Sequence, residues 1–112
     1  MNLIDRCRKL INTFHIDPDN IVRINDITTL IGDKTYIVGT VVKHVYRDSY
    51  LYTILFASGR YKVYKCDDSK TDIVRVIRMM KKNSFTHKQI SEILSISENE
   101  VSSMFVKNQE VI

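Results

Sequence analysis

Apolar residues recur along this chain with two different periods, which divide it into helical and extended segments. At the beginning, five apolar side chains fall on one face of a helix, while Asp5, Arg6, Arg8 and Lys9 cover the other face: Leu3, Cys7, Leu10, Ile11 and Phe14. Because Pro disfavours helical geometry in the residue before it, Asp17-Pro18 ends this pattern. The spacing predicts an amphipathic helix over Leu3 to His15.

The next segment, residues 19–32, carries a mixed signal. Its isoleucines recur at nearly helical spacing, yet its β-branched content favours a strand: Ile21, Ile24, Ile27 and Ile31. We expect one short strand or turn, followed by a short helix that ends at Gly32.

From Lys34 onward the pattern is that of a β-meander. Strands are predicted over Thr35 to Tyr46, Tyr50 to Ala57 and Arg60 to Cys66. The turns are 47–49 and Ser58-Gly59, and the second is short enough for a tight hairpin.

Three helix starts follow, and each carries a side chain that can cap it. Ser69 with Asp72, Thr86 with Gln89, and Ser97 with Glu100 have the spacing of a capping box, in which the first side chain accepts from the amide three residues later. Hydrophobic staples accompany the last two boxes, through Phe85 with Ile90 and Ile96 with Val101. These signals predict three short helices.

The apolar stripes indicate how these helices pack. The first, Ser69 to Lys82, would bury Ile73, Val74, Ile77 and Met80; the second would bury Ile90, Ile93 and Leu94; the third would bury Val101, Met104 and Phe105. The fold class is therefore α+β: an N-terminal helix and a three-stranded antiparallel meander (residues 1–68), followed by a tri-helical unit (residues 69–112).

Residues 69–108 resemble the helix-turn-helix DNA-binding superfamily. The small residues Ser91 and Ser95 stand in the first helix and at the turn, where alanine and glycine are commonest, and apolar residues stand at the remaining positions: Leu94, Ile96, Val101 and Met104. Both serines are small, so the two helices can still cross closely.

The resemblance implies a small sequence-specific DNA-binding protein that regulates transcription near a promoter or origin, with double-stranded DNA as its partner. No nucleophile elbow, glycine-rich phosphate loop or HExxH motif occurs, so no catalytic activity is expected. The outward face of the last helix would meet bases or the groove wall through Asn99, Ser102, Ser103 and Lys107, with Val106 beside them. Phosphates would be held by Arg75, Arg78, Lys82 and Lys88. Such proteins often act as dimers, so a homodimer is expected, with the N-terminal part as a candidate interface.

Glu98 and Glu100 place negative charge where the last helix should approach DNA. An adaptor or inhibitor that binds a protein, such as a polymerase or nuclease, is therefore the alternative. The sheet suggests a third function, because Tyr46, Tyr50, Tyr52, Tyr61 and Tyr64 are interleaved with Arg47, Arg60 and Lys62. Aromatic rings beside cations can stack on the bases of single-stranded nucleic acid.

Composition and charge limit the possible partners and cellular location of the protein. The 112 residues are 44% apolar and carry a formal net charge of +4, which permits nucleic acid as a partner without requiring it. Residues 1–68 and 69–112 each carry +2, so binding would depend on placed charges. Charged residues from position 5 argue against a signal peptide, and no apolar run would cross a membrane. We expect a cytoplasmic protein, whose small size would suit a phage or mobile element; if it is viral, it would act in the host cytoplasm.

No cofactor or metal is expected. Cys7 and Cys66 form no C-x-x-C pair, and the three histidines show no ligand spacing, so we expect reduced thiols. Pro18-Asp19 and Asp68-Ser69-Lys70 formally match the acidic elements of a metal-dependent nuclease family. A turn and a helix cap explain them better.

Overall fold

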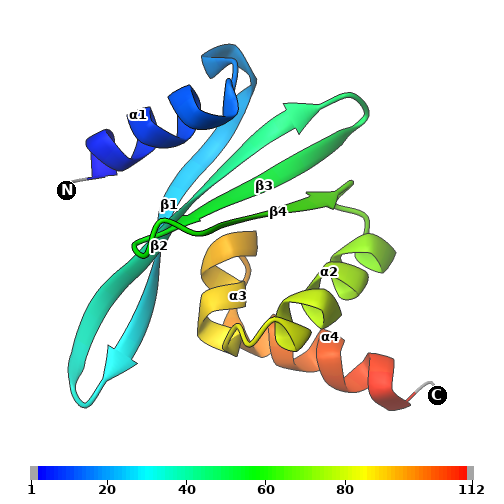
Figure 1. Ribbon diagram of the computed structural model, residues 1–112. Helices are drawn as coiled ribbons and strands as arrows, with labels where there is room; N and C mark the ends of the chain where they lie inside the picture. The colour runs from blue at the N-terminus through cyan, green and yellow to red at the C-terminus, as the bar shows by residue number, and fades with distance from the viewer. Residues whose placement is uncertain (1–2, 111–112) are drawn as a thin grey trace.

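The computed structural model describes the backbone of residues 3–110 and the side chains of residues 4–105. Four helices and four strands follow one another, with a short 3-10 helix (η1) after the first: α1 Leu3–Phe14, η1 Pro18–Asn20, β1 Ile21–Ile31, β2 Lys34–Tyr46, β3 Ser49–Phe56, β4 Tyr61–Cys66, α2 Lys70–Lys82, α3 His87–Leu94 and α4 Glu98–Glu110 (Figure 1). The predicted α+β class is confirmed.

All four strands form one antiparallel sheet in the order β1-β2-β3-β4. The three predicted strands occur with bounds shifted by about one residue, but the prediction of three strands was wrong. The fourth is β1, which pairs with β2 from Ile21 to Ile31 and is interrupted by irregularities after Ile21 and after Ile27.

Residues 19–32 were predicted to hold a short strand and a helix ending at Gly32, and that helix does not form. The segment is one long strand whose isoleucines serve both faces of the sheet. Ile27 belongs to the core under the C-terminal helices, whereas Ile21 and Ile24 pack beneath α1. A strand covered on both faces loses the simple alternation of apolar and polar residues, which is why its spacing resembled that of a helix.

Helix α1 covers one face of the sheet, α2 and α3 cover the other, and α4 lies on the far side of α2 and α3 (Figure 1). Under α1, the fully buried Leu10 packs with Val42 of β2, and Phe14 meets the ring of Tyr61 edge to face at 5.0 Å. Polar contacts complete this layer, because the Arg6 guanidinium binds Asp26 at 2.8 Å and donates to the Thr40 hydroxyl at 2.8 Å. The N-terminal helix therefore packs on its own sheet.

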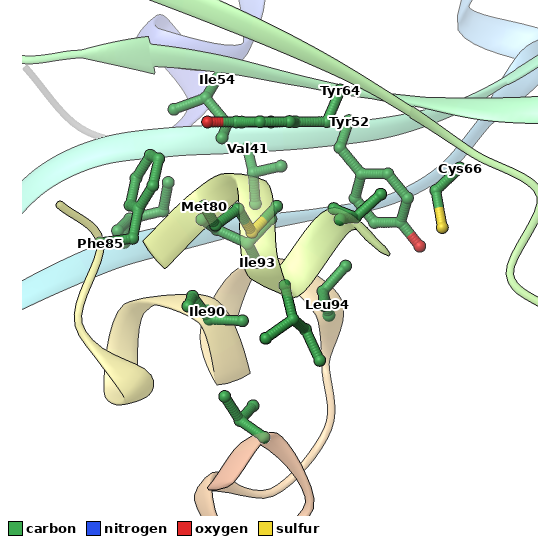
Figure 2. Packing of buried hydrophobic residues seen from close by; sticks show 14 residues of the cluster. Val41, Tyr52, Ile54, Tyr64, Cys66, Met80, Phe85, Ile90, Ile93 and Leu94 are labelled. Atoms are coloured by element: carbon green, nitrogen blue, oxygen red, sulfur yellow. The ribbon is translucent and has the colours of Figure 1, made fainter. Parts of the chain in front are cut away.

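The larger core lies between the sheet and the C-terminal helices (Figure 2). Val41, Tyr52 and Ile54 point down from the strands, and side chains of the helical part rise to meet them, including Met80, Phe85, Ile90 and Ile93. One hydrophobic core thus includes residues from before and after residue 68, so the helical unit is packed directly against the sheet.

A polar cluster closes the junction between the two parts. The Tyr52 hydroxyl donates to Asp68 Oδ1 at 2.7 Å, and Lys43 forms an ion pair with the other carboxylate oxygen. Burial, reinforced by the bond to Asp68, raises the pKa of Tyr52 far above its usual value. Asp68 has a φ of 63°, a conformation that aspartate tolerates better than most residues, and it directs the chain from β4 into α2.

Candidate nucleic-acid interface

Helix α3 is attached to the edge strand β1 by polar side chains. Arg23 donates to the Ile93 carbonyl at 2.8 Å, and the Asn25 amide donates to the Glu92 carbonyl at 2.8 Å. In return, the Glu92 carboxylate accepts from the Thr28 amide at 3.0 Å and from its hydroxyl at 2.7 Å. These bonds satisfy the carbonyls at the helix end and a free amide of the edge strand, and they fix α3 against the sheet.

Helix α3 begins and ends as its sequence predicted. Thr86 and Gln89 form a complete capping box, with each side chain accepting from the other residue's backbone amide. The helix ends at Ser95, whose left-handed conformation (φ 57°) makes the turn toward α4. Most side chains disfavour this conformation, whereas glycine adopts it readily.

Helix α4 starts at the third predicted cap, where the Glu100 amide donates to the Ser97 hydroxyl at 3.0 Å. The Glu100 carboxylate accepts from that same hydroxyl at 3.3 Å, rather than from the Ser97 amide as a full box requires. Val101 is fully buried, and Met104 and Phe105 pack against the core. The helix lies on α2 and α3, far from the sheet (Figure 1), so its opposite face is left to solvent.

Two of the predicted base-contacting residues stand on that outer face. Asn99 and Ser103 are exposed and, four residues apart, lie one above the other on the helix. Ser102 lies at the edge, half-buried, with its hydroxyl bonded to His87 Nδ1 at 2.9 Å. The side chains of Val106 and Lys107 lie outside the described residues.

The start of α2 borders the outer face of α4 on one side. Lys70 lines a surface hollow together with Asn99, Glu100, Ser103 and Met104. It also lines a second hollow along α2, with Thr71, Val74, Arg75 and Arg78. Sequence reasoning did not assign Lys70 to this surface, although its spacing of four from Val74 and eight from Arg78 places it on the same helix face.

The start of α3 borders α4 on the other side. His87 is bonded to Ser102, and its ring meets that of Phe105 edge to face at 6.0 Å. Lys88 is the next residue and is half-buried. The outer face of α4 therefore lies between two helix N-termini, each of which carries a lysine.

The predicted phosphate contacts have different surroundings. Arg75 holds α2 to the sheet, because its guanidinium forms an ion pair with Asp72 at 2.6 Å and donates to the Lys65 carbonyl at 2.7 Å. The bond to Asp72 raises the pKa of Arg75, and the bond to Arg75 lowers the pKa of Asp72. Arg78 and Lys82 are exposed on α2. Lys82, twelve residues after Lys70, lies about 18 Å from it along the helix axis.

Negative charge is present on the same surface. Glu98 and Glu100 are exposed in the first turn of α4, where the helix dipole favours acidic side chains. Glu100 shares the hollow of Lys70. The outer face of α4 is therefore polar and mixed in charge, with cations concentrated on the two flanking helices.

The tyrosine-rich sheet does not form an open aromatic platform. Tyr52 and Tyr64 are buried in the core, and Tyr50 is half-buried beneath the Lys43 ammonium. Tyr46 and Tyr61 keep 41% and 61% of their surface exposed, but they lie on different strands, and Tyr61 packs on Phe14. Covered faces leave little of the stacking surface that single-stranded nucleic acid requires.

The nuclease-like residues have structural partners. Asp19 follows Pro18 in η1, where its amide donates to Asp17 at 2.9 Å. Ser69 caps α2, and Asp68 binds Lys43 and Tyr52. Within residues 4–105, no group of three or more His, Cys, Asp or Glu side chains could hold a metal ion.

Both cysteines are free thiols. Cys7 is half-buried in α1 and Cys66 is fully buried at the end of β4. Burial raises the pKa of the Cys66 thiol to about 11, so it stays protonated near neutral pH.

Comparison with known protein families, with curated proteins and with solved structures finds no match to this chain. Over the described range, no helix is both long and apolar enough to cross a membrane.

Proposed function

We propose that the protein binds double-stranded DNA with the tri-helical unit α2–α4, and that α4 enters the major groove. The observation that carries this proposal is the position of Asn99 and Ser103 on the one outward face of α4, between the N-termini of α2 and α3. A recognition helix bordered by donors for the phosphates on both sides is the arrangement that groove binding needs.

The chemistry of the outer face suits base recognition. An asparagine amide can accept from N6 of adenine and donate to its N7, and a serine hydroxyl can bond to either base type. Both side chains are exposed, so they can reach bases without displacing a core contact. Ser102 is assigned a supporting place, because its bond to His87 ties α4 to the start of α3.

Phosphate binding is assigned to Lys70 with Arg78 on the α2 side and to Lys88 on the α3 side. Helix N-termini add unpaired amides and a positive dipole end, both of which favour phosphate. Arg75 is left out, because its guanidinium already binds Asp72 and the Lys65 carbonyl. A small regulator of transcription, acting as a homodimer at a promoter or origin, is the cellular role that this binding would serve.

The test is fluorescence anisotropy of the whole chain with a mixed-sequence duplex and a matched single strand, at several salt concentrations. Duplex binding that weakens steeply with salt supports the proposal. Equal or tighter binding of the single strand, or no binding at low salt, would overturn it.

Variants locate the surface. Lys70→Ala with Arg78→Ala should make the plot of log K against log salt less steep, reducing the magnitude of its slope by about 2. Each lost phosphate contact reduces that magnitude by about 1. Arg47→Ala is the matched control, since Arg47 is an exposed cation at the β2–β3 turn, outside the helical unit. Asn99→Ala should change the preferred sequence in a site-selection experiment while leaving the salt slope almost unchanged.

An adaptor function is the second candidate, and the exposed acids Glu98 and Glu100 favour it. If these acids bind a basic protein surface, the chain should show no affinity for any duplex, and Glu98→Gln with Glu100→Gln should abolish capture of the protein partner. If they only moderate DNA binding, the same double variant should tighten it.

A further inference from the structure

The β1–β2 hairpin extends past the rest of the sheet. Phe56, the last residue of β3, pairs with Gly39, whereas β1 and β2 continue to pair as far as Ile31 with Lys34. We call residues 28–38 the arm; it is the free hairpin end in Figure 1. Within the described chain, no strand pairs with the β3 side of residues 34–37. Alternate residues of a strand direct their N–H and C=O groups to each side, so this segment presents an open hydrogen-bonding edge.

The arm is apolar on both faces. Four large side chains on it keep between 46% and 64% of their surface exposed: Leu30, Ile31, Tyr36 and Ile37. The cross-strand register puts Leu30 on the face of Ile37, and Ile31 on the face of Tyr36. An open edge combined with apolar faces favours the addition of another strand.

A hollow lies beside that edge. The arm residues Ile37 and Val38 form one side, and the end of β3, the β3–β4 turn and the start of β4 (residues 56–62) form the rest, around a volume of about 890 Å³. A second hollow of about 210 Å³ shares Ile37, Phe56 and Ala57 and continues toward α1. Together they make an apolar groove that continues the line of β3.

The charged groups that line this groove are all cations, although the charge of Arg6 is already paired with Asp26, so the net positive charge comes from Lys9, Arg60 and Lys62. Arg60 and Lys62 line the first hollow, and Arg6 and Lys9 line the second, while neither lining includes an acidic side chain. Lys62 donates to the neutral Asn83 amide oxygen at 2.9 Å, so its charge is not cancelled there. The groove is complementary to a ligand that carries negative charge and apolar groups.

We propose that the groove binds an acidic peptide in extended conformation, which pairs with residues 34–37 of β2 as a continuation of β3. The open edge selects a peptide, because only a polypeptide backbone can use its alternating donors and acceptors. The arm itself carries one acid, Asp33, next to one base, Lys34, so a second copy of the arm would bring no net negative charge. Apolar residues of the peptide would fill the hollow, and its carboxylates would lie near Arg60 and Lys9.

The test uses fluorescein-labelled peptides and the whole chain. A short peptide in which Glu and Asp alternate with Val and Ile should bind, and the same peptide with Lys at the acidic positions should bind at least about tenfold more weakly. Proline at every second position removes the amides that face the edge, and it should abolish binding. Equal binding of acidic and basic peptides, full binding of the proline peptide, or no binding at all would each overturn the proposal.

Variants assign the binding to this groove. Lys9→Glu with Arg60→Glu should weaken the acidic peptide at least about tenfold, since both side chains are exposed and line its two hollows. Arg47→Glu, in the β2–β3 turn at the opposite end of β2 from the arm, should leave binding of the acidic peptide unchanged. Ile37→Glu is a second variant that tests whether the peptide binds in this groove, and circular dichroism checks that it still folds. If sedimentation instead shows a dimer that Ile37→Glu dissociates, the arm belongs to a second copy and the proposal fails.

Discussion

Helices α3 and α4 differ in how they are held, although they are consecutive and each begins with a cap. Helix α3 packs through Ile90, Ile93 and Leu94 and is also bonded to β1 at its C-terminal end. Helix α4 packs through its inner face and leaves Asn99 and Ser103 to solvent. Helix α3 therefore fixes the helical unit against the sheet, whereas α4 presents exposed side chains. This division suits a protein that binds a partner through one helix.

The largest expected effect on the free energy of unfolding comes from truncating a buried side chain of α3, in comparison with an exposed one of α4. Ile93→Ala should lower the free energy of unfolding by about 3 kcal/mol, because Ile93 is fully buried between α3 and the sheet and its loss leaves a cavity. Ser103→Ala, on the outer face of α4, should change it by less than about 0.5 kcal/mol. Urea denaturation of both variants measures this difference. Similar costs would mean that Ser103 is not free of the core.

The polar attachment of α3 comes next. Glu92→Ala should cost about 2 kcal/mol, because it leaves the half-buried Thr28 amide and hydroxyl without their acceptor. Glu98→Ala is the matched control in the exposed first turn of α4 and should cost less than about 0.5 kcal/mol. Faster hydrogen exchange at the Thr28 amide in the first variant alone would locate the effect. Unchanged exchange would contradict this role for Glu92.

The sequence predicted α2, α3 and α4 well because their signals are local. A cap, a staple and an apolar stripe lie within a few residues of one another, and each of the three helices starts directly after its predicted cap. The predicted set of buried residues in α2 had one wrong member. Val76 is fully buried, whereas Val74, which was predicted to be buried, is half-buried beside Lys70. A tri-helical unit without other contacts has no reason to bury Val76, but in this fold Val76 belongs to the same core cluster as Tyr64 and Cys66 of β4.

The rest depended on contacts that are distant in the sequence. Where the long strand β1 runs, only a short strand or turn and a helix were expected, because α1 covers one face of β1 and its apolar residues therefore serve both sides. Arg75 was assigned to phosphate because nothing in the sequence indicates that the Lys65 carbonyl lies within reach of its guanidinium. Lys70 was overlooked as a surface neighbour of Asn99, since only the packing of α2 on α4 brings them together.

The two helix caps should differ in strength. Thr86→Ala removes a complete capping box and should lower the free energy of unfolding by about 1 kcal/mol or slightly more. Ser97→Ala removes an incomplete box, in which the Glu100 carboxylate accepts from the serine hydroxyl and not from the Ser97 amide. It should therefore lower the free energy of unfolding by less, about 0.5 kcal/mol. Thermal and urea denaturation of the two variants give the comparison. A larger cost at Ser97 would show that α4 depends on its cap more than α3 does.

The smallest expected effect lies at the turn between the two helices. Ser95 has a left-handed backbone (φ 57°), which costs a residue with a Cβ roughly 1 kcal/mol that glycine does not pay. Glycine also gains freedom in the unfolded chain, so Ser95→Gly should raise the free energy of unfolding by only about 0.5 kcal/mol. Ser91→Gly is the control, because it lies inside α3 and should destabilise by about 0.5 kcal/mol. If both glycines destabilise equally, the turn at Ser95 is not strained, and the orientation of α4 relative to α3 depends on packing alone.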